Sequence, residues 1–231
     1  FVFIICKNRE NFKRIFYGTF FQSIKFRLRN IFQNNKRNSI KNISFHYDKG
    51  NEFYSSWLDD SMSYSSAIFK NENESLIDGQ NNKYDRIINM LKISKGKNLL
   101  EIGCGWGGFL GRLSMKNNFN IPARGITISK EQYRFLKTNS NENLKKVDLI
   151  DYRELKGQFD YIVSIEMFEA VGKKYWNTFF KKIQNLLKPT GDLVMQNILI
   201  KDGLYNQYSK RTDFIREFIF PGGFLPSNQL F

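Results

Sequence analysis

From residue 97 onward, hydrophobic residues fall in short runs that are separated by longer segments with helical periodicity. The short runs predict strands at residues 98–102, 121–126, 146–150, 159–164 and 191–198. The longer segments predict helices at 107–117, 129–139 and 173–187, and Lys188-Pro-Thr-Gly191 is a strong stop signal after the last of them. Strands that alternate with helices, with glycines at the turns, predict an α/β fold with a parallel, doubly wound sheet.

Before residue 97 the pattern differs, and it divides the chain into three predicted segments. Residues 1–42 mix basic and aromatic side chains and are expected to be helical, whereas residues 96–231 form the α/β domain. Residues 43–95 lie between them and contain a helix near 74–92. One face of that helix carries the apolar side chains of Leu76, Tyr84, Ile87, Ile88 and Leu91.

Composition places the chain among ordinary globular proteins. Its 231 residues are 41% hydrophobic and 25% charged, enough for one substantial core. The two cysteines, Cys6 and Cys104, favour neither a disulfide framework nor a metal site, so a reducing cytoplasm is the expected compartment. The apolar run at residues 1–6 is too short to span a bilayer. Both ends of the sequence look cut, so we expect a fragment whose sheet continues past residue 231.

The net charge of +14 is unevenly distributed along the chain. Residues 1–45 contribute +9, from ten basic side chains against Glu10 alone. Such a field attracts polyanions, either nucleic acid or an anionic lipid surface. The interleaved aromatic and aliphatic side chains favour an interfacial helix on an anionic membrane, and nucleic acid is not expected. A solvated basic face, or helices packed on another domain, are the alternatives.

The strongest chemical signal is a glycine-rich loop between the first predicted strand and the helix after it. Gly103, Gly105 and Gly107 allow a sharp turn there, and without Cβ atoms a ligand can lie directly against the backbone. The start of the following helix supplies unpaired N–H groups for polar ligand atoms. The loop therefore predicts a nucleotide cofactor, with a purely structural turn as the alternative.

Two kinds of cofactor fit the glycine spacing. Gly103, Gly105 and Gly108 satisfy the dinucleotide pattern G-x-G-x-x-G, and Arg124 lies near the position where an NADP enzyme places an arginine. Spacing alone therefore keeps NADP open.

Three features around the loop favour S-adenosylmethionine instead. Glu101 precedes the loop by two residues, where a carboxylate can accept from the positively charged amino-acid end of that cofactor. The bulky Trp106 occupies the loop, and Thr127-Ile-Ser-Lys-Glu-Gln132 offers hydroxyl and amide groups to a ribose. An NADP oxidoreductase is thus the least favoured of the functions considered.

The chain resembles a known family over about residues 40–231. The resemblance is carried by the glycine loop together with His46-Tyr-Asp-Lys-Gly-Asn51, Met62-Ser-Tyr-Ser-Ser66, Thr127-Ile-Ser-Lys-Glu-Gln132, Asp151-Tyr-Arg-Glu-Leu155, Phe159-Asp-Tyr-Ile-Val-Ser-Ile-Glu-Met-Phe-Glu-Ala-Val-Gly172 and Phe220-Pro-Gly-Gly-Phe-Leu-Pro226. These segments are similar to the cyclopropane-fatty-acyl-phospholipid synthases of the mycolic acid cyclopropane synthase type. The resemblance implies a class I methyltransferase with a Rossmann-like sheet, and a helical lid at 43–95 over its cofactor site.

The resemblance also implies which residues contact S-adenosylmethionine. They come from the lid, the glycine loop and the ends of the second, third and fourth strands: Tyr64, Ser65, Glu101, Gly103, Cys104, Gly105, Gly107, Thr127, Ile128, Gln132, Asp151, Tyr152 and Ile165. For Tyr152 and Ile165, ordinary packing is an equally good interpretation. The lone histidine, His46, belongs to the lid motif and is expected to be structural rather than catalytic.

The implied reaction adds the one-carbon unit of the cofactor to the double bond of an unsaturated phospholipid acyl chain and closes a cyclopropane ring. An alkene is a weak nucleophile, so the site must be dry and aligned, and a base must remove a proton. The resemblance implies bound bicarbonate as that base. Its site corresponds to Glu169, Ser66, Gln196 and the backbone of Ile198. Glu166, one turn earlier, is equally well explained by helix capping.

Several residues depart from the family pattern. Ser66 stands where a cysteine is usual, and Gln196 and Ala170 stand where histidines are usual. Ser66 and Gln196 can still donate hydrogen bonds to an anion. The departures also suit a methylene or methyl branch in place of the ring, a small-molecule amine N-methyltransferase, or a copy that binds without turnover.

A further segment concerns the lipid. Phe214, Ile215, Phe218 and Ile219 fit an apolar helix face, which the resemblance places at the wall of an acyl channel, with core packing as the alternative. Together with the basic N-terminus, it favours a cytoplasmic enzyme that is peripheral to the inner face of the cell membrane. The sequence carries no signal for an oligomeric state.

Overall fold

A computed structural model describes Lys7 and residues 34–47, 50–116, 121–139 and 146–230. Its centre is a sheet of five parallel strands in the order β3-β2-β1-β4-β5. The strands are β1 (Leu99–Ile102), β2 (Ala123–Thr127), β3 (Val147–Leu149), β4 (Phe159–Ile165) and β5 (Leu187–Gln196). The five predicted strands and the parallel, doubly wound arrangement are confirmed. Most of the predicted N-terminal interfacial helix lies outside the described residues.

Strand β5 begins four residues earlier than its pattern predicts. Leu187 already pairs with Phe159, and regular pairing resumes only at Tyr161 with Asp192. The residues in between, 188–191, form an irregular stretch of the strand. Helix α9 (Trp176–Leu186) does end immediately before the predicted stop signal.

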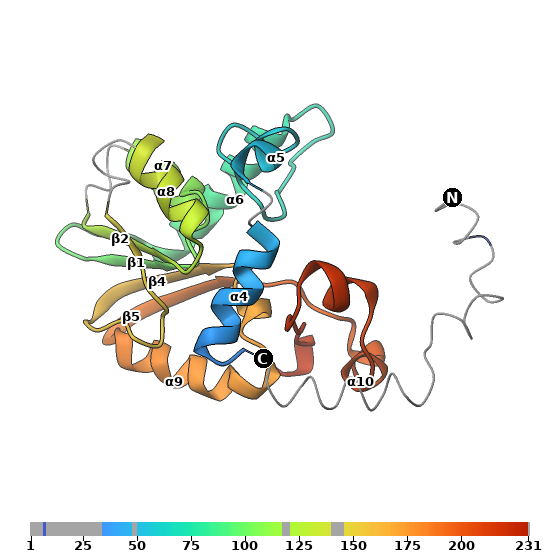
Figure 1. The fold of residues 1–231 in the computed structure, drawn as a ribbon. Helices are drawn as coiled ribbons and strands as arrows, with labels where there is room; N and C mark the ends of the chain where they lie inside the picture. Colours follow the sequence, from blue (N-terminus) through green and yellow to red (C-terminus); the bar gives the residue numbers. More distant parts are fainter. Residues whose placement is uncertain (1–6, 8–33, 48–49, 117–120, 140–145, 231) are drawn as a thin grey trace.

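Helices cover both faces of the sheet (Figure 1). On one face lie α6 (Leu76–Leu91), α7 (Gly108–Met115) and α8 (Lys130–Asn139), whose apolar side chains pack on the strands. On the other face α9 packs through Phe179, Ile183 and Leu186. Strand β1 is buried at all four positions, as expected for a central parallel strand.

Helix α6 shows how local sequence sets an element in place. Ser75 and Asp78 form a capping box at its start, and Lys92 ends it in a left-handed conformation. Tyr84, Ile87, Ile88 and Leu91 are buried as predicted, whereas Leu76, the first residue of the helix, is 40% exposed. It lies roughly 20° around the helix from Ile87, so it belongs to the predicted face but stands in the first turn.

Helix α4 (Lys36–Tyr47) is held by hydrogen bonds to two loops that are distant in the sequence. It contains the proposed segment boundary at residue 42. Just before it, Asn34 donates its amide to the carbonyl of Gly222 at 2.7 Å. Arg153, in the loop after β3, donates to the Asn34 carbonyl at 3.0 Å and to the Ser39 hydroxyl at 3.2 Å. A short helix, α5 (Asn51–Ser55), follows before the chain reaches α6.

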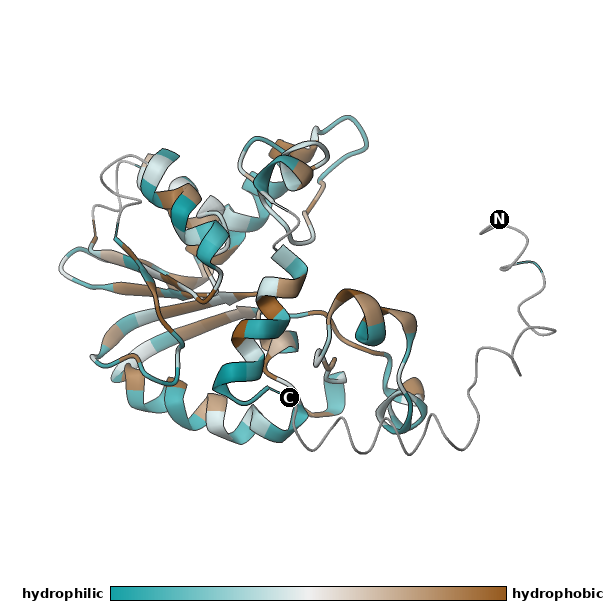
Figure 2. Cartoon of the chain, in the orientation of Figure 1, coloured by the Kyte–Doolittle hydropathy of each residue, from teal (hydrophilic) through white to brown (hydrophobic). Residues whose placement is uncertain are grey.

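After β5 the chain forms α10 (Asp202–Lys210) and the π-helix η3 (Ile215–Ile219). The predicted apolar helix is therefore present, but Phe214, Ile215 and Phe218 are 66%, 52% and 59% exposed. Figure 2 shows this hydrophobic turn on the outside of the molecule. Core packing does not explain these three side chains. In the part of the chain that the structure describes, no helix combines the length and apolar character needed to cross a bilayer.

Candidate functional site

The sheet topology marks where a ligand can bind. Strands β1 and β4 are neighbours, but the chain leaves them toward opposite edges of the sheet, from β1 to β2 and from β4 to β5. In parallel sheets, ligands bind at the carboxyl ends of the two strands where the order reverses. Gly103 follows β1 at this point, and Glu166 follows β4.

The glycine loop is built as the sequence predicts. Gly103, Gly105 and Gly107 have φ values of 78°, 55° and 87°, in the left-handed region that favours glycine. A Cβ atom on Gly103 would lie 2.6 Å from Cγ of Met167, so this glycine is required by packing. A Cβ atom on Gly105 would have no neighbour within 4 Å, so the backbone there faces open space. Gly105 is therefore the point where a ligand can approach the loop.

Glu101, on β1, is an unusual buried acid. Its side chain is 3% exposed, and Oε2 has no hydrogen-bond partner among the described residues. Burial raises the pKa of Glu101 well above its ordinary value, and the nearby Lys83 opposes that rise. An unpartnered buried carboxylate beside an open loop fits a ligand that brings a positive or hydrogen-donating group.

Lys83 is a site residue that the sequence reasoning missed. It is fully buried, and its ammonium donates to the Ser65 hydroxyl and to Oε1 of Gln80. Gln80 in turn donates to the Ser65 carbonyl at 2.8 Å. Burial lowers the pKa of Lys83 to about 8, opposed by the carboxylates of Glu166, Asp59 and Glu101. Its position four residues before Ile87, on the buried face of α6, is the signal that could have identified it.

Tyr64, next to Ser65, lies in an aromatic cluster. Its ring stacks on His46 at 5.5 Å between centroids, and His46 lies 4.2 Å from Phe220. Nδ1 of His46 lies 3.0 Å from the Ile219 carbonyl oxygen. The cluster thus joins α4, the segment before α6 and the end of η3, and the structural role of His46 stays a prediction that these contacts fit.

The predicted ribose residues form a tight turn at the end of β2. The Thr127 hydroxyl donates to Oε1 of Gln132 at 2.8 Å, and it accepts from the Ser129 backbone at 3.1 Å. Thr127 and Gln132 are buried, whereas Ile128 is partly exposed. The structure therefore brings these residues together, and their contact with a ribose stays a prediction.

Other predicted contact residues have partners within the protein. Both oxygens of Asp151 accept from Arg153, at distances of 2.5 to 2.9 Å. Tyr152 packs edge-on against Phe179 at 5.3 Å between centroids. Ile165 packs on the core cluster that α6, α7 and α8 share with the sheet. Their roles as cofactor contacts stay predictions.

Cys104, within the glycine loop, is buried. Burial raises the pKa of its thiol well above the ordinary value, and Glu101 adds to that rise. The thiol is thus held neutral and is no nucleophile.

Two of the four residues predicted to be catalytic, Ser66 and Gln196, meet at a fifth residue, Glu166, and the other two, Glu169 and Ile198, contact each other. Oε1 of Glu166 accepts from the backbone N–H of Ser66 at 2.9 Å, from the Ser66 hydroxyl at 2.5 Å and from Nε2 of Gln196 at 2.8 Å. Glu169, one turn later, accepts from the backbone N–H of Ile198 through Oε1. We refer to Ser66, Glu166, Glu169, Gln196 and Ile198 as the carboxylate cluster.

Within this cluster Glu169 is held in an apolar setting. Its Oε2 is buried and has no hydrogen-bond partner among the described residues. Burial raises the pKa of Glu169 to about 7, the Ile198 N–H lowers it, and the negative charge of Glu166 raises it further. A carboxyl group with such a pKa can hold or release a proton near neutral pH.

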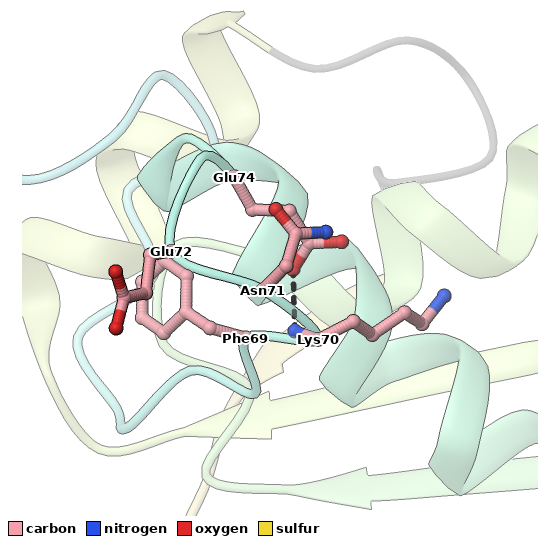
Figure 3. A pocket seen from close by; sticks show the side chains of 5 residues that line it. All are labelled: Phe69, Lys70, Asn71, Glu72 and Glu74. Carbon is pink, nitrogen blue, oxygen red and sulfur yellow. Dashed lines mark hydrogen bonds between the residues drawn. The ribbon is translucent and has the colours of Figure 1, made fainter.

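A surface hollow elsewhere on the chain is not part of this site. It is lined by Phe69, Lys70, Asn71, Glu72 and Glu74 in the turn before α6 (Figure 3). The Lys70 backbone N–H donates to Glu74 across it at 2.6 Å. None of the predicted site residues lines it.

The strand order and the glycine loop after β1 define the α/β fold of class I methyltransferases, and solved structures agree. The cyclopropane synthase MmaA2 from Mycobacterium tuberculosis matches with a TM-score of 0.73 at 27% identity, over 83% of this chain and 71% of that one. The mycolic acid cyclopropane synthase CmaA1, complexed with SAH and CTAB, matches with a TM-score of 0.70 at 30% identity, over 81% and 70%. The predicted fold class is confirmed.

Sequence comparison then identifies the family. Residues 34–230 match the family described as mycolic acid cyclopropane synthetase, and the chain belongs to it. The cyclopropane-fatty-acyl-phospholipid synthase of Escherichia coli K12 is 38% identical over 187 residues, 79% of this chain and 46% of the relative. Tuberculostearic acid methyltransferase UfaA1 of M. tuberculosis is 33% identical over 200 residues, 82% and 46%. The chain thus spans about half the length of these curated relatives, and the predicted resemblance is confirmed.

Proposed function

We propose that this chain binds S-adenosylmethionine and transfers its one-carbon unit to the double bond of an unsaturated phospholipid acyl chain, which becomes a cyclopropane ring. The observation that carries the proposal is the open backbone at Gly105 beside the unpartnered buried carboxylate of Glu101. Both lie at the carboxyl end of β1, where a ligand is expected, in a chain that belongs to a cyclopropane synthetase family.

The residues present fit this cofactor. The open backbone at Gly105 would leave room for its amino-acid portion, and Glu101 would accept from its positively charged amine. When bound, the cofactor supplies an electrophilic methyl group on a sulfonium. Lys83 and Gln80 hold Ser65, and with it the lid segment, in place. The aromatic rings of Tyr64, His46 and Phe220 pack together next to Ser65, and such apolar surroundings suit an alkene acceptor.

The lipid substrate is supported by the surface around η3. Phe214, Ile215 and Phe218 are exposed there, and Phe220 connects the same segment to Tyr64 of the lid. Apolar side chains at a surface, combined with the charge of +9 in residues 1–45, suit an anionic leaflet. The proposed location is thus cytoplasmic, on the inner face of the cell membrane, with unsaturated phospholipids as the partners and no nucleic acid.

The test is an isotope experiment on the full-length protein. Liposomes of unsaturated phospholipid are incubated with methyl-deuterated S-adenosylmethionine, and the acyl chains are analysed by mass spectrometry. A cyclopropane product gains one carbon, keeps two of the three deuterons and resists hydrogenation at that position. Label that appears only on added amines, with all three deuterons retained, would refute the lipid proposal.

A second candidate is a methylene or methyl branch on the same acyl chain. It is supported by the way Ser66 and Gln196 are engaged by Glu166, which changes the surroundings of the developing cation. A relative named a tuberculostearic acid methyltransferase supports it as well. The same experiment separates the candidates, because a methylene branch keeps an alkene that hydrogenation reduces. A saturated methyl branch formed by reduction also gains hydrogen from the reductant.

A further inference from the structure

Three donors converge on one oxygen of the carboxylate cluster. The backbone N–H and the hydroxyl of Ser66, and the side-chain amide of Gln196, all donate to Oε1 of Glu166. Ser66 and Gln196 are the side chains that the family resemblance assigns to a bound bicarbonate. A small anion needs such donors, and here a carboxylate of the chain itself already uses them. The residues present therefore do not fit bicarbonate.

The backbone of Glu166 has an unusual conformation that a neighbouring strand maintains. Its φ is 47°, a left-handed conformation that costs a residue with a side chain about 1 kcal/mol or more. Its backbone N–H donates to the Gln196 carbonyl at 2.8 Å, and its carboxylate accepts from the Gln196 side chain. Gln196, at the end of β5, therefore holds both the backbone and the side chain of Glu166. Unfavourable backbone geometry that neighbouring contacts maintain is typical of functional sites.

We infer that the Glu166 carboxylate is a built-in anion that takes the place of bicarbonate, so that this protein neither binds nor requires it. The inference rests on the proposed function. Within the described residues, Oε2 of Glu166 has no hydrogen-bond partner, so this oxygen is available to the substrate.

The chemical step balances with this carboxylate as the acceptor. The alkene π electrons form a bond to the transferred carbon, and the electrons of the broken C–S bond stay on sulfur. The neighbouring alkene carbon becomes cationic and is stabilised by the negative charge of Glu166. The electrons of one C–H bond of the transferred carbon then close the ring, and its proton passes to Oε2 of Glu166 and on to water.

The decisive test measures bicarbonate binding directly, by NMR of ¹³C-labelled bicarbonate with the full-length protein. Wild type is compared with Glu166→Gly, because glycine accepts the left-handed backbone and frees the donors of Ser66 and Gln196. We expect binding to the variant and none to wild type. Binding to wild type, or binding to neither protein, would overturn the inference. Equal affinity of both proteins for S-adenosylhomocysteine shows that the variant is folded.

Activity gives a second readout. Wild type is expected to keep its full rate in buffer depleted of carbon dioxide, whereas Glu166→Gly loses about a hundredfold and recovers when bicarbonate is added. Glu166→Gln keeps the side-chain volume without the charge, so it loses activity and is not rescued. Glu72→Gly, on an exposed turn, is the matched control and keeps the wild-type rate. A wild-type rate that falls when carbon dioxide is depleted contradicts the inference. A complete lack of lipid product contradicts the proposed function instead, and the bicarbonate-binding measurement then decides the inference.

Discussion

Replacing Glu169 with glutamine gives a quantitative test of the carboxylate cluster. The carboxyl group is ordinarily half-ionised near pH 4.5, but burial raises the pKa of Glu169 to about 7 in the folded protein. Between these two values the unfolded chain is ionised here and the folded protein is not. Folding therefore takes up a proton, and this contribution to stability is lost as the pH rises.

The magnitude follows from the size of the shift. Each pKa unit corresponds to about 1.4 kcal/mol, so the full effect is on the order of 3 kcal/mol. It is fully present below pH 4.5 and fully lost above the folded-state pKa of about 7. Glutamine at this position has no proton to exchange. The unfolding free energy of Glu169→Gln minus that of wild type should thus rise by about 2 to 3 kcal/mol as the pH increases from about 5 to about 8.

The assay is urea unfolding of both proteins across this pH range, with the difference in unfolding free energy plotted against pH. Other titrating groups cancel in the difference, and any fixed cost of the buried amide shifts the curve without changing its slope. Glu72→Gln, on an exposed turn, controls for the loss of one negative charge. A difference between Glu169→Gln and wild type that stays constant with pH would refute the placement of this carboxyl group in an apolar setting.

Three further substitutions test other parts of the site. Gly105→Asp should abolish binding of S-adenosylhomocysteine in calorimetry, because it fills the open face of the loop with a charged side chain, whereas Gly96→Asp, at another open left-handed glycine, should leave it intact. Equal binding by both would refute this location for the cofactor. Lys83→Met should weaken the same binding about tenfold, because the lid segment loses its anchor; an unchanged affinity would count against that role. Arg153→Ala leaves Asp151 buried and unpaired, so urea unfolding should show a loss of about 3 kcal/mol, and a loss below about 1 kcal/mol would contradict the pairing.

The sequence was sufficient for the sheet and for the glycine-rich turn after β1. Alternating apolar runs and helical segments predict all five strands, and glycines at fixed places after β1 predict the turn, because both depend on local constraints. The end of β5 was also close, although its start was not. A register shift arises from pairing with β4, and no local pattern in residues 187–191 records it.

The polar interactions of the site were harder to predict. Lys83 lies on the buried face of α6, and only its neighbours in space show that it binds Ser65 and Gln80. Glu166 could be read as a helix cap, whereas its three donors come from residues 100 and 30 positions away. Contacts between such distant residues depend on how the sheet brings the lid and β5 together.

The unpartnered carboxyl group of Glu101 also affects the resistance of the protein to proteolysis. Without a ligand, the buried Glu101 oxygen has no hydrogen-bond partner, which costs free energy of folding. A bound group that donates to this oxygen would remove that cost. Ligand binding then stabilises the folded state by mass action, and the fraction of time that the chain spends open to proteases falls accordingly. Under the proposed function, the abundance of this protein in the cell would follow the supply of its methyl donor.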